Sequence, residues 1–269
     1  MCYTSVIINK YRVGENGFNI LINMISSHHK KNKDGYAIMF SDFKRTRRMR
    51  TLNFSEFIDF VLQNKHNIMN SRIVHLHLRL STNIVTQKFV HLWKISDFYC
   101  SHNGMLYNNY DLKKMNDSLL FFTKIQDDLK TQNMENIKTK LENVSGFGRF
   151  ILSNPKDKKL IVIAYNCECY LQHINDNLIV TSSKYTINDS CSFEIDANKK
   201  IKCFGFSLTE KRVKKIHSKV FVNRYASGCF SNKLIFYDLE KRKVIKVLDI
   251  EPFMNFNFHT KKKGYWYYY

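Results

Sequence analysis

Short runs in which apolar and polar residues alternate are the feature that most restricts how this chain can fold. Alternation with a period of two is typical of β-strands, because successive side chains of a strand point to opposite faces. The spacing between the runs predicts antiparallel strands joined by hairpins. The runs are YTSVIIN, YAIMFSD, RIVHLHLRL, RFILSN, KLIVIAY, CYLQHI, NLIVTSS and CSFEID.

Segments between these runs have the period of amphipathic helices. Residues 54–65 carry apolar side chains at i, i+3, i+4, i+7 and i+8, which form one face. Residues 118–130 follow Asp117 and Ser118, both residue types that cap helices. Residues 133–144 place four apolar side chains on one stripe. Strands in runs with helices between the runs predict an α+β layered fold.

The last part of the chain is more basic than the rest. We expect a basic surface helix over 209–220 and a hairpin over 232–250 that turns at residues 240–242. The shift in composition near residue 205 divides the chain into a main domain, 2–204, and a basic extension, 205–269, packed on the same domain.

Composition limits the class of protein. With 269 residues, only 9 Gly and 2 Pro, the chain shows no flexible linker. No run reaches transmembrane length and no signal peptide precedes the first strand, so a soluble, cytoplasmic protein without membrane contact is expected. The seven cysteines show no paired framework and are expected to be reduced thiols.

The formal net charge of +20 has two interpretations. It is the charge of a protein that binds nucleic acid, or it reflects lysine used throughout the chain. The segment KRTRRMR supplies Arg45, Arg47, Arg48 and Arg50, which are suited to phosphate. The C-terminal HTKKKGYWYYY joins cations to aromatic rings, as a stacking platform for nucleic acid or a docking site for a partner does.

Cys2 raises the question of an N-terminal nucleophile. Once Met1 is removed, Cys2 carries a thiol with an ordinary pKa of about 8.5 and a free amine with a pKa near 8. The amine is then able to serve as general base for its own side chain. Acyl transfer further requires an oxyanion hole, groups that bind the charges of the substrate, and a terminus held by a buried strand. The run TSVIIN supplies that strand.

The residues that could meet these further requirements each have a catalytic and a structural interpretation. Asn103 and Gly104 are an oxyanion hole or a hairpin turn. Arg79 shares one face of a strand with His75 and His77, and binds a carboxylate or a structural partner. The two histidines form a metal pair without a third ligand at a recognisable spacing, so we expect no metal and no cofactor. Asp117 caps a helix or holds a substrate ammonium.

In order along the chain, these motifs form one pattern: Cys2, then Arg79-x-x-Thr82, then His102-Asn103-Gly104, then Asp117-Ser118. The pattern resembles the class II glutamine amidotransferases, which use an N-terminal nucleophile. DGYAIMF and the segment from GFGRFILSN to LIVTSSK also occur in the order that the family has them. The resemblance covers roughly residues 2–190.

The resemblance implies a fold, an activity and a role for each residue. The fold is a four-layer αββα sandwich of two antiparallel sheets, the N-terminal nucleophile hydrolase fold. Cys2 attacks the side-chain amide of glutamine, which releases ammonia and leaves a glutamyl thioester for water to cleave. Asn103 and Gly104 form the oxyanion hole. The substrate-binding residues are Arg79 and Thr82 for the carboxylate, Asp117 for the ammonium, and His102.

The residues after position 190 are too few for a complete ammonia-accepting domain, so the acceptor is expected to be a separate protein. The family usually has glycine after the nucleophile, whereas this chain has Tyr3. A bulky side chain there favours an alternative, the hydrolysis of another γ-glutamyl amide. A further alternative is a catalytically silent scaffold that binds nucleic acid or protein.

Overall fold

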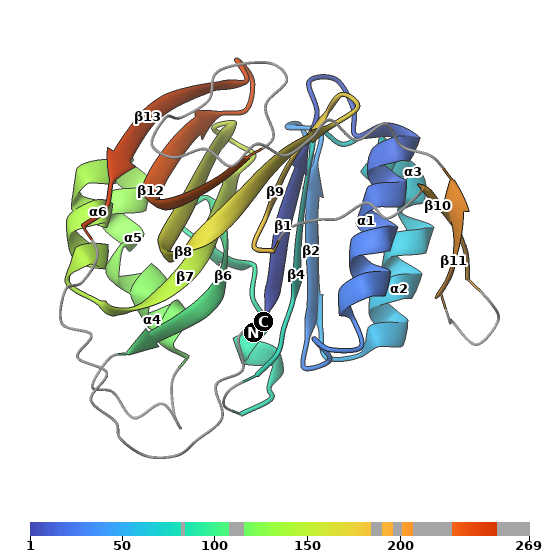
Figure 1. Ribbon diagram of the computed structural model, residues 1–269, viewed down its shortest axis with the longest axis horizontal. Coiled ribbons are helices and arrows are strands. Elements are labelled where there is room, and N and C mark those ends of the chain that lie inside the picture. Colours follow the sequence, from blue (N-terminus) through green and yellow to red (C-terminus); the bar gives the residue numbers. More distant parts are fainter. Residues whose placement is uncertain (82–83, 108–115, 184–189, 196–200, 207–227, 252–269) are drawn as a thin grey trace.

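The computed structural model describes residues 1–81, 84–107, 116–183, 190–195, 201–206 and 228–251. Within these residues the protein is a mixed α/β fold built on a curled antiparallel sheet (Figure 1). Eleven strands belong to this sheet: β1 Tyr3–Ile8, β2 Tyr36–Ser41, β3 Thr46–Thr51, β4 Ile73–Leu78, β5 Trp93–Ile95, β6 Phe98–Tyr107, β7 Ser145–Asn154, β8 Lys159–Ile174, β9 Asn177–Thr181, β12 Gly228–Asp238 and β13 Lys243–Asp249. A separate hairpin joins β10 Ser190–Ile195 to β11 Ile201–Phe206.

The strand order in the large sheet is β3-β2-β4-β1-β9-β8-β7-β6-β5, with β12 on β8 and β13 on β12. We name β3, β2, β4, β1 and β9 the β1 half, and β7, β6, β5, β12 and β13 the β7 half. The strand β8 joins the two halves, because its first part pairs with β7 and its last part pairs with β9. The two sheets that the sequence analysis expects are therefore halves of one continuous sheet.

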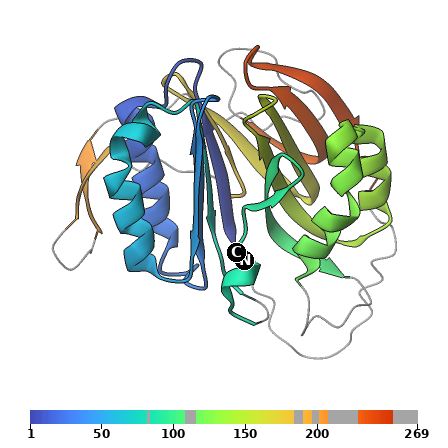
Figure 2. The same ribbon diagram turned by 180° about the vertical axis from the view of Figure 1, so that it is seen from behind.

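Helices cover the outer side of each half, as both views show (Figures 1 and 2). The β1 half is covered by α1 Gly14–His28, α2 Phe54–Gln63 and α3 Lys65–Met69. The β7 half is covered by α4 Asp117–Lys124, α5 Gln126–Thr131 and α6 Met134–Glu142. A short 3₁₀ helix, η1 Gln87–Phe89, precedes β5.

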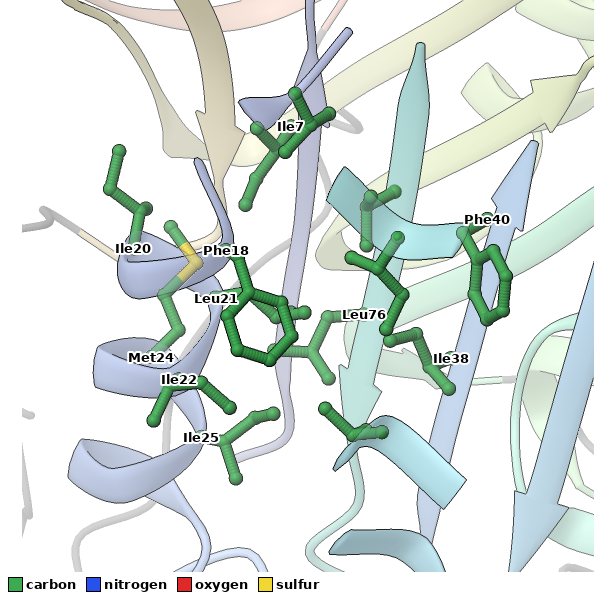
Figure 3. Packing of buried hydrophobic residues seen from close by; sticks show 14 of the residues in the cluster. Ile7, Phe18, Ile20, Leu21, Ile22, Met24, Ile25, Ile38, Phe40 and Leu76 are labelled. Carbon is green, nitrogen blue, oxygen red and sulfur yellow. The ribbon is translucent and has the colours of Figure 1, made fainter. Parts of the chain in front are cut away.

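Apolar side chains fill the space between each half and its helices. Under α1, the outward residues of β1, β2 and β4 pack against the helix (Figure 3); they include Ile7, Ile38, Phe40 and Leu76, against Phe18, Leu21, Ile22 and Ile25. A second cluster packs α4, α5 and α6 on β6, β7 and β8. A third cluster lies between the two halves and includes Val6, Ile8, Ile151, Val162 and Val180. Strand alternation thus gives β1 one apolar face toward α1 and another toward the β7 half.

Most of the predicted elements are confirmed. Each of the eight alternating runs overlaps a strand, and the helices at 54–65 and 133–144 become α2 and α6. The hairpin over 232–250 forms as β12 and β13. The helix expected over 118–130 is two helices, because the chain breaks between α4 and α5 at Ile125. The basic helix at 209–220 lies outside the described residues.

The elements that were not predicted include α1 and β3. The helix α1 has apolar residues at helical spacing, but two glycines and three asparagines lower its intrinsic helix propensity. The arginine-rich segment forms β3, an edge strand. Asn103 and Gly104 lie inside β6, so the hairpin turn considered for them is wrong. The predicted boundary between the main domain and the basic extension, at 204/205, falls within β11. This division of the chain stays a prediction.

Candidate functional site

Cys2 lies at the start of β1, which is a fully buried strand between β4 and β9. Its Sγ donates to the backbone carbonyl of Leu80 over 3.5 Å. On the other side of Cys2, the carbonyl of Met1 accepts a hydrogen bond of 2.8 Å from the side chain of Asn32. The strand and these two contacts hold the first residues of the chain in place.

Burial raises the pKa of the Cys2 thiol above its ordinary value, because the thiolate would lose its hydration. The hydrogen bond at Leu80 and the positive charges of the chain terminus and Arg79 oppose this rise, while Asp117 adds to it. The thiol therefore stays protonated at neutral pH and needs a base to become a nucleophile.

A small pocket lies in front of Cys2. Five of the seven residues that the sequence predicts for the site line it: Cys2, Arg79, His102, Gly104 and Asp117. The other lining residues are Met1, Leu80, Ser81, His91, Met105, Asn116, Ser118 and Phe147. Asn103 does not line the pocket, and Thr82 lies outside the described residues.

Arg79 follows β4 and is held by the loop before β2. Its backbone N–H donates to Gly35, and its carbonyl accepts from the backbone of Asp34. The carboxylate of Asp34 accepts from the N–H of Ser81 over 2.7 Å, which closes this turn. Arg79 as a residue is 2% exposed, and its guanidinium donates through Nη2 to the carbonyl of Ile84. Burial lowers the pKa of Arg79, whereas the nearby Cys2, Asp34 and Asp117 raise it.

The strand β6 faces β1 near Cys2 and brings Gly104 to the pocket. The hydroxyl groups of Thr4 on β1 and Ser101 on β6 are 2.6 Å apart, and both Cys2 and Gly104 line the pocket. Asn103 shares with Ser101 the face of β6 that points to β1. The side-chain Oδ1 of Asn103 is buried and accepts no hydrogen bond from any described residue.

On the other face of β6, His102 contacts the start of α4. Its Nδ1 lies 2.7 Å from the hydroxyl of Ser118, which also donates to Asp117 over 3.3 Å. The second carboxylate oxygen of Asp117 accepts from the backbone N–H of Leu106 on β6. The N-cap of α4 is Asn116, whose side chain accepts a hydrogen bond from the backbone of the helix. The cap was expected at Asp117 or Ser118, and it lies one residue before Asp117. Asp117 thus ties α4 to β6 and still lines the pocket.

His91 is a pocket residue that the sequence analysis missed. It is 3% exposed, and its ring stacks on His77 with the ring centroids 3.9 Å apart. Its Nδ1 accepts a hydrogen bond of 3.2 Å from the backbone N–H of His102, so the proton of the neutral ring lies on Nε2. Burial lowers the pKa of His91 well below 6.5, which keeps the ring neutral at physiological pH.

Two arginines of β3 hold the segment that carries His91. Arg50 donates from Nε to the carbonyl of Val90 over 2.9 Å, and Arg48 donates to the carbonyl of Leu92 over 3.0 Å. The contacts fall on the residues before and after His91. The arginine cluster thus has a structural use near the pocket.

The proposed nucleic-acid surface was Arg45, Arg47, Arg48 and Arg50. Arg47 donates to the side chain of Asn64, so three of the four guanidinium groups bind their own chain. The C-terminal aromatic tail lies outside the described residues. Binding of nucleic acid to either segment stays a prediction.

Tyr3 does not narrow the pocket. Its side chain is 2% exposed and lies in the cluster under α1, where it stacks on His28 with the ring centroids 3.8 Å apart. Cys2 and Tyr3 point to opposite faces of β1 because they are neighbours in a strand. Tyr3 therefore does not line the pocket, and the alternative substrate that it favoured, another γ-glutamyl amide, stays a prediction.

His75 and His77 lie on one face of β4, as predicted, and both are completely buried between the two halves of the sheet. His75 hydrogen-bonds Ser101 on β6 and Ser153 on β7. Within the part of the chain that the structure describes, no cluster of three His, Cys, Asp or Glu side chains is arranged to hold a metal ion. None of the described helices is both long enough and apolar enough to cross a membrane.

No protein-family model and no curated protein matches this chain. Among solved structures, glutamine phosphoribosylpyrophosphate amidotransferase from B. subtilis matches with 17% identity and a TM-score of 0.49, over 79% of this chain and 50% of that one. A glutamine aminotransferase class-II domain protein from Silicibacter pomeroyi matches with 12% identity and a TM-score of 0.44, over 77% and 100%. A predicted glutamine amidotransferase from Pseudomonas aeruginosa matches with 11% identity and a TM-score of 0.41, over 91% and 98%.

Two of these names contain the words glutamine and amidotransferase, and the third names a glutamine aminotransferase class-II domain. This chain spans about half the length of the B. subtilis protein.

Proposed function

We propose that this chain is a class II glutamine amidotransferase-like amide hydrolase whose nucleophile is Cys2 after removal of Met1. The observation that carries the proposal is the pocket at the start of β1, where a thiol, a buried guanidinium and a carboxylate meet. Glutamine presents the complementary groups: an amide to attack, a carboxylate and an ammonium. This agreement of charges comes from three separate segments of the chain.

The reaction begins with the thiol of Cys2. Its proton passes to the α-amine of the same residue, and Sγ forms a bond to the amide carbon of the substrate. The amine then returns the proton to the leaving nitrogen, the C–N bond breaks, and ammonia departs from the glutamyl thioester. A water molecule, deprotonated by the same amine, cleaves the thioester to glutamate and restores the thiol.

The other residues bind the charges of the reaction. Asn103 and Gly104 donate to the oxyanion of the tetrahedral intermediate. Arg79, with Thr82, binds the α-carboxylate as a two-pronged donor. Asp117 binds the α-ammonium, and His102 completes the wall of the binding site.

The finer expectations belong to the same proposal. The curled sheet with helices on both outer sides is proposed to be the four-layer sandwich of the N-terminal nucleophile hydrolases. The ammonia is proposed to serve an acceptor enzyme on another chain. The cytoplasmic location, and the division into a domain at 2–204 and an extension at 205–269, stay predictions.

The intact mass of the protein tests the proposal. It is measured before and after exposure to a diazo-ketone analogue of glutamine, for the wild type and for Cys2→Ala. We expect loss of Met1 and a single covalent adduct on the wild type, and no adduct on Cys2→Ala. Cys100→Ala is the matched control, since Cys100 is buried on β6 and is expected to leave the adduct unchanged.

Two outcomes would oppose the proposal. Retention of Met1 would leave Cys2 without its base and favour the silent scaffold. A free Cys2 that ignores the glutamine analogue but hydrolyses another γ-glutamyl amide would change the substrate and leave the nucleophile in place.

A further inference from the structure

Asn32 is a buried polar residue whose side chain reaches the start of the chain. It lies after α1, is 3% exposed, and its backbone N–H donates to the carbonyl of His28 over 2.9 Å. Its side-chain Nδ2 donates to the carbonyl of Met1 over 2.8 Å. The carbonyl that accepts this hydrogen bond belongs to the peptide bond between Met1 and Cys2, which must be cleaved to free the amine of Cys2.

Removal of Met1 takes away the partner of this side chain. The oxygen and nitrogen of one peptide group are only about 2.3 Å apart, given the usual bond lengths. The new α-amine of Cys2 therefore lies next to the position that the Met1 carbonyl had occupied. A carboxamide can present either its oxygen or its nitrogen after a half-turn, so Asn32 can accept a hydrogen bond where it had donated one.

We propose that Asn32 is a positioning residue that accepts a hydrogen bond from the α-amine of Cys2 and directs its lone pair toward Sγ. This inference rests on the proposed function, and concerns a residue that none of the sequence motifs contains. Asn32 acts through the amine and does not touch the substrate.

A neutral acceptor suits the role of the amine as a base. An acceptor is needed because a buried amine without a partner would be costly and free to rotate. A carboxylate at the same place would favour the charged ammonium and prevent the amine from taking a proton at neutral pH. The charged groups that face this end of β1 are Arg79, Asp34 and Asp117, which come from three other segments. Asn32 adds an acceptor to this set without adding charge.

The test is the pH dependence of alkylation of Cys2 by iodoacetamide, a small neutral probe that needs no glutamine pocket. Each variant is made with a cleavable leader so that every sample begins at Cys2. Asn32→Asp keeps the shape of the side chain and adds a negative charge. We expect the midpoint of the rate profile to move up by about one pH unit. Asn32→Ala is expected to keep the fold, seen by circular dichroism, and to slow alkylation about tenfold at pH 7.5.

Asn143→Asp is the matched control, because it adds the same charge at an exposed residue after α6. It is expected to keep the wild-type midpoint. If Asn32→Asp has the same midpoint as Asn143→Asp, or if Asn32→Ala alkylates at the wild-type rate, the inference is overturned. Failure of the proposed function has a different signature, which is a wild-type protein that retains Met1 or refuses the glutamine analogue.

Discussion

At the scale of single residues, Arg79 offers a sharp test of substrate binding. Lysine keeps the charge but loses the two-pronged geometry that fits a carboxylate. Losing one charged hydrogen bond costs about 1.5–3 kcal/mol, so we expect Arg79→Lys to raise KM for glutamine about 10- to 100-fold, with a smaller effect on kcat. Steady-state kinetics of ammonia release gives both constants.

The control for this prediction is Arg72→Lys. Arg72 precedes the opposite end of β4, where its guanidinium lies 4.5 Å from the ring centroid of Phe43. It is expected to leave KM unchanged. An unchanged KM in Arg79→Lys would exclude Arg79 from carboxylate binding.

The sequence predicted those site residues that belong to short motifs. Cys2, Arg79, Gly104 and Asp117 each have a chemical reason to be noticed at their position, and all of them line the pocket. His91 carries no such signal, because it stands alone between apolar residues and reaches the pocket only after the loop is placed by β3. Its hydrogen bond to the backbone of β6 is a long-range contact that no local pattern encodes.

At the scale of elements, two glycines on the paired strands β6 and β7 make space for the imidazole ring of His102. Gly104 faces Gly148 across the two strands, and a Cβ on Gly148 would lie 2.0 Å from Nε2 of His102. The ring of His102 also stacks on Phe150, with the centroids 4.2 Å apart. The two glycines are therefore needed for the close approach of a side chain.

We expect Gly148→Ala to destabilise the protein by about 1–3 kcal/mol, because the ring must move from a packed position. Urea denaturation measures the change. In the background of His102→Ala the atom in closest contact is gone, so the same substitution is expected to cost less. Equal costs in both backgrounds would mean that the ring of His102 is not what excludes a side chain at Gly148.

Elements were predicted from sequence where the periodic pattern is local and strong. The strands β1, β4 and β9 have it, and so does α2. The edge strand β3 was missed because its exposed arginines hide the alternation, while tertiary contacts to the 87–92 segment stabilise it. The dipeptide Asn103-Gly104 is a common turn, but pairing with β7 on one side keeps it extended.

At the scale of the whole molecule, β8 decides the architecture. A strand of 16 residues that changes its partner from β7 to β9 bends one sheet over itself. In the sequence this strand reads as two runs, because polar residues around Asn166 interrupt the apolar pattern. In the structure Asn166 has a φ of 51° at this point of the strand. The resulting interior between the halves holds histidines as well as aliphatic side chains.

These buried histidines make stability depend on pH. Burial lowers the pKa of His75 to about 3 and that of His102 to about 4, and lowers the pKa of His77 and His91 well below 6.5. The unfolded chain binds protons at these sites below pH 6.5, whereas the folded chain does not. Their contribution to stability is thus complete above pH 6.5 and is lost as the pH falls toward 4, by about 1.4 kcal/mol per unit for each histidine.

We therefore expect the free energy of unfolding in urea to be constant near pH 7.5 and to fall steeply between pH 6 and pH 4.5. His75→Gln removes one of the titrating groups and keeps hydrogen-bonding capacity between Ser101 and Ser153, so the slope should decrease by about one proton. His66→Gln, at an exposed residue of α3, should leave the slope as it is. A free energy that stays level down to pH 5 would mean that the interior between the two halves admits charged histidines, and that the pocket beside them is more open to water than its buried residues indicate.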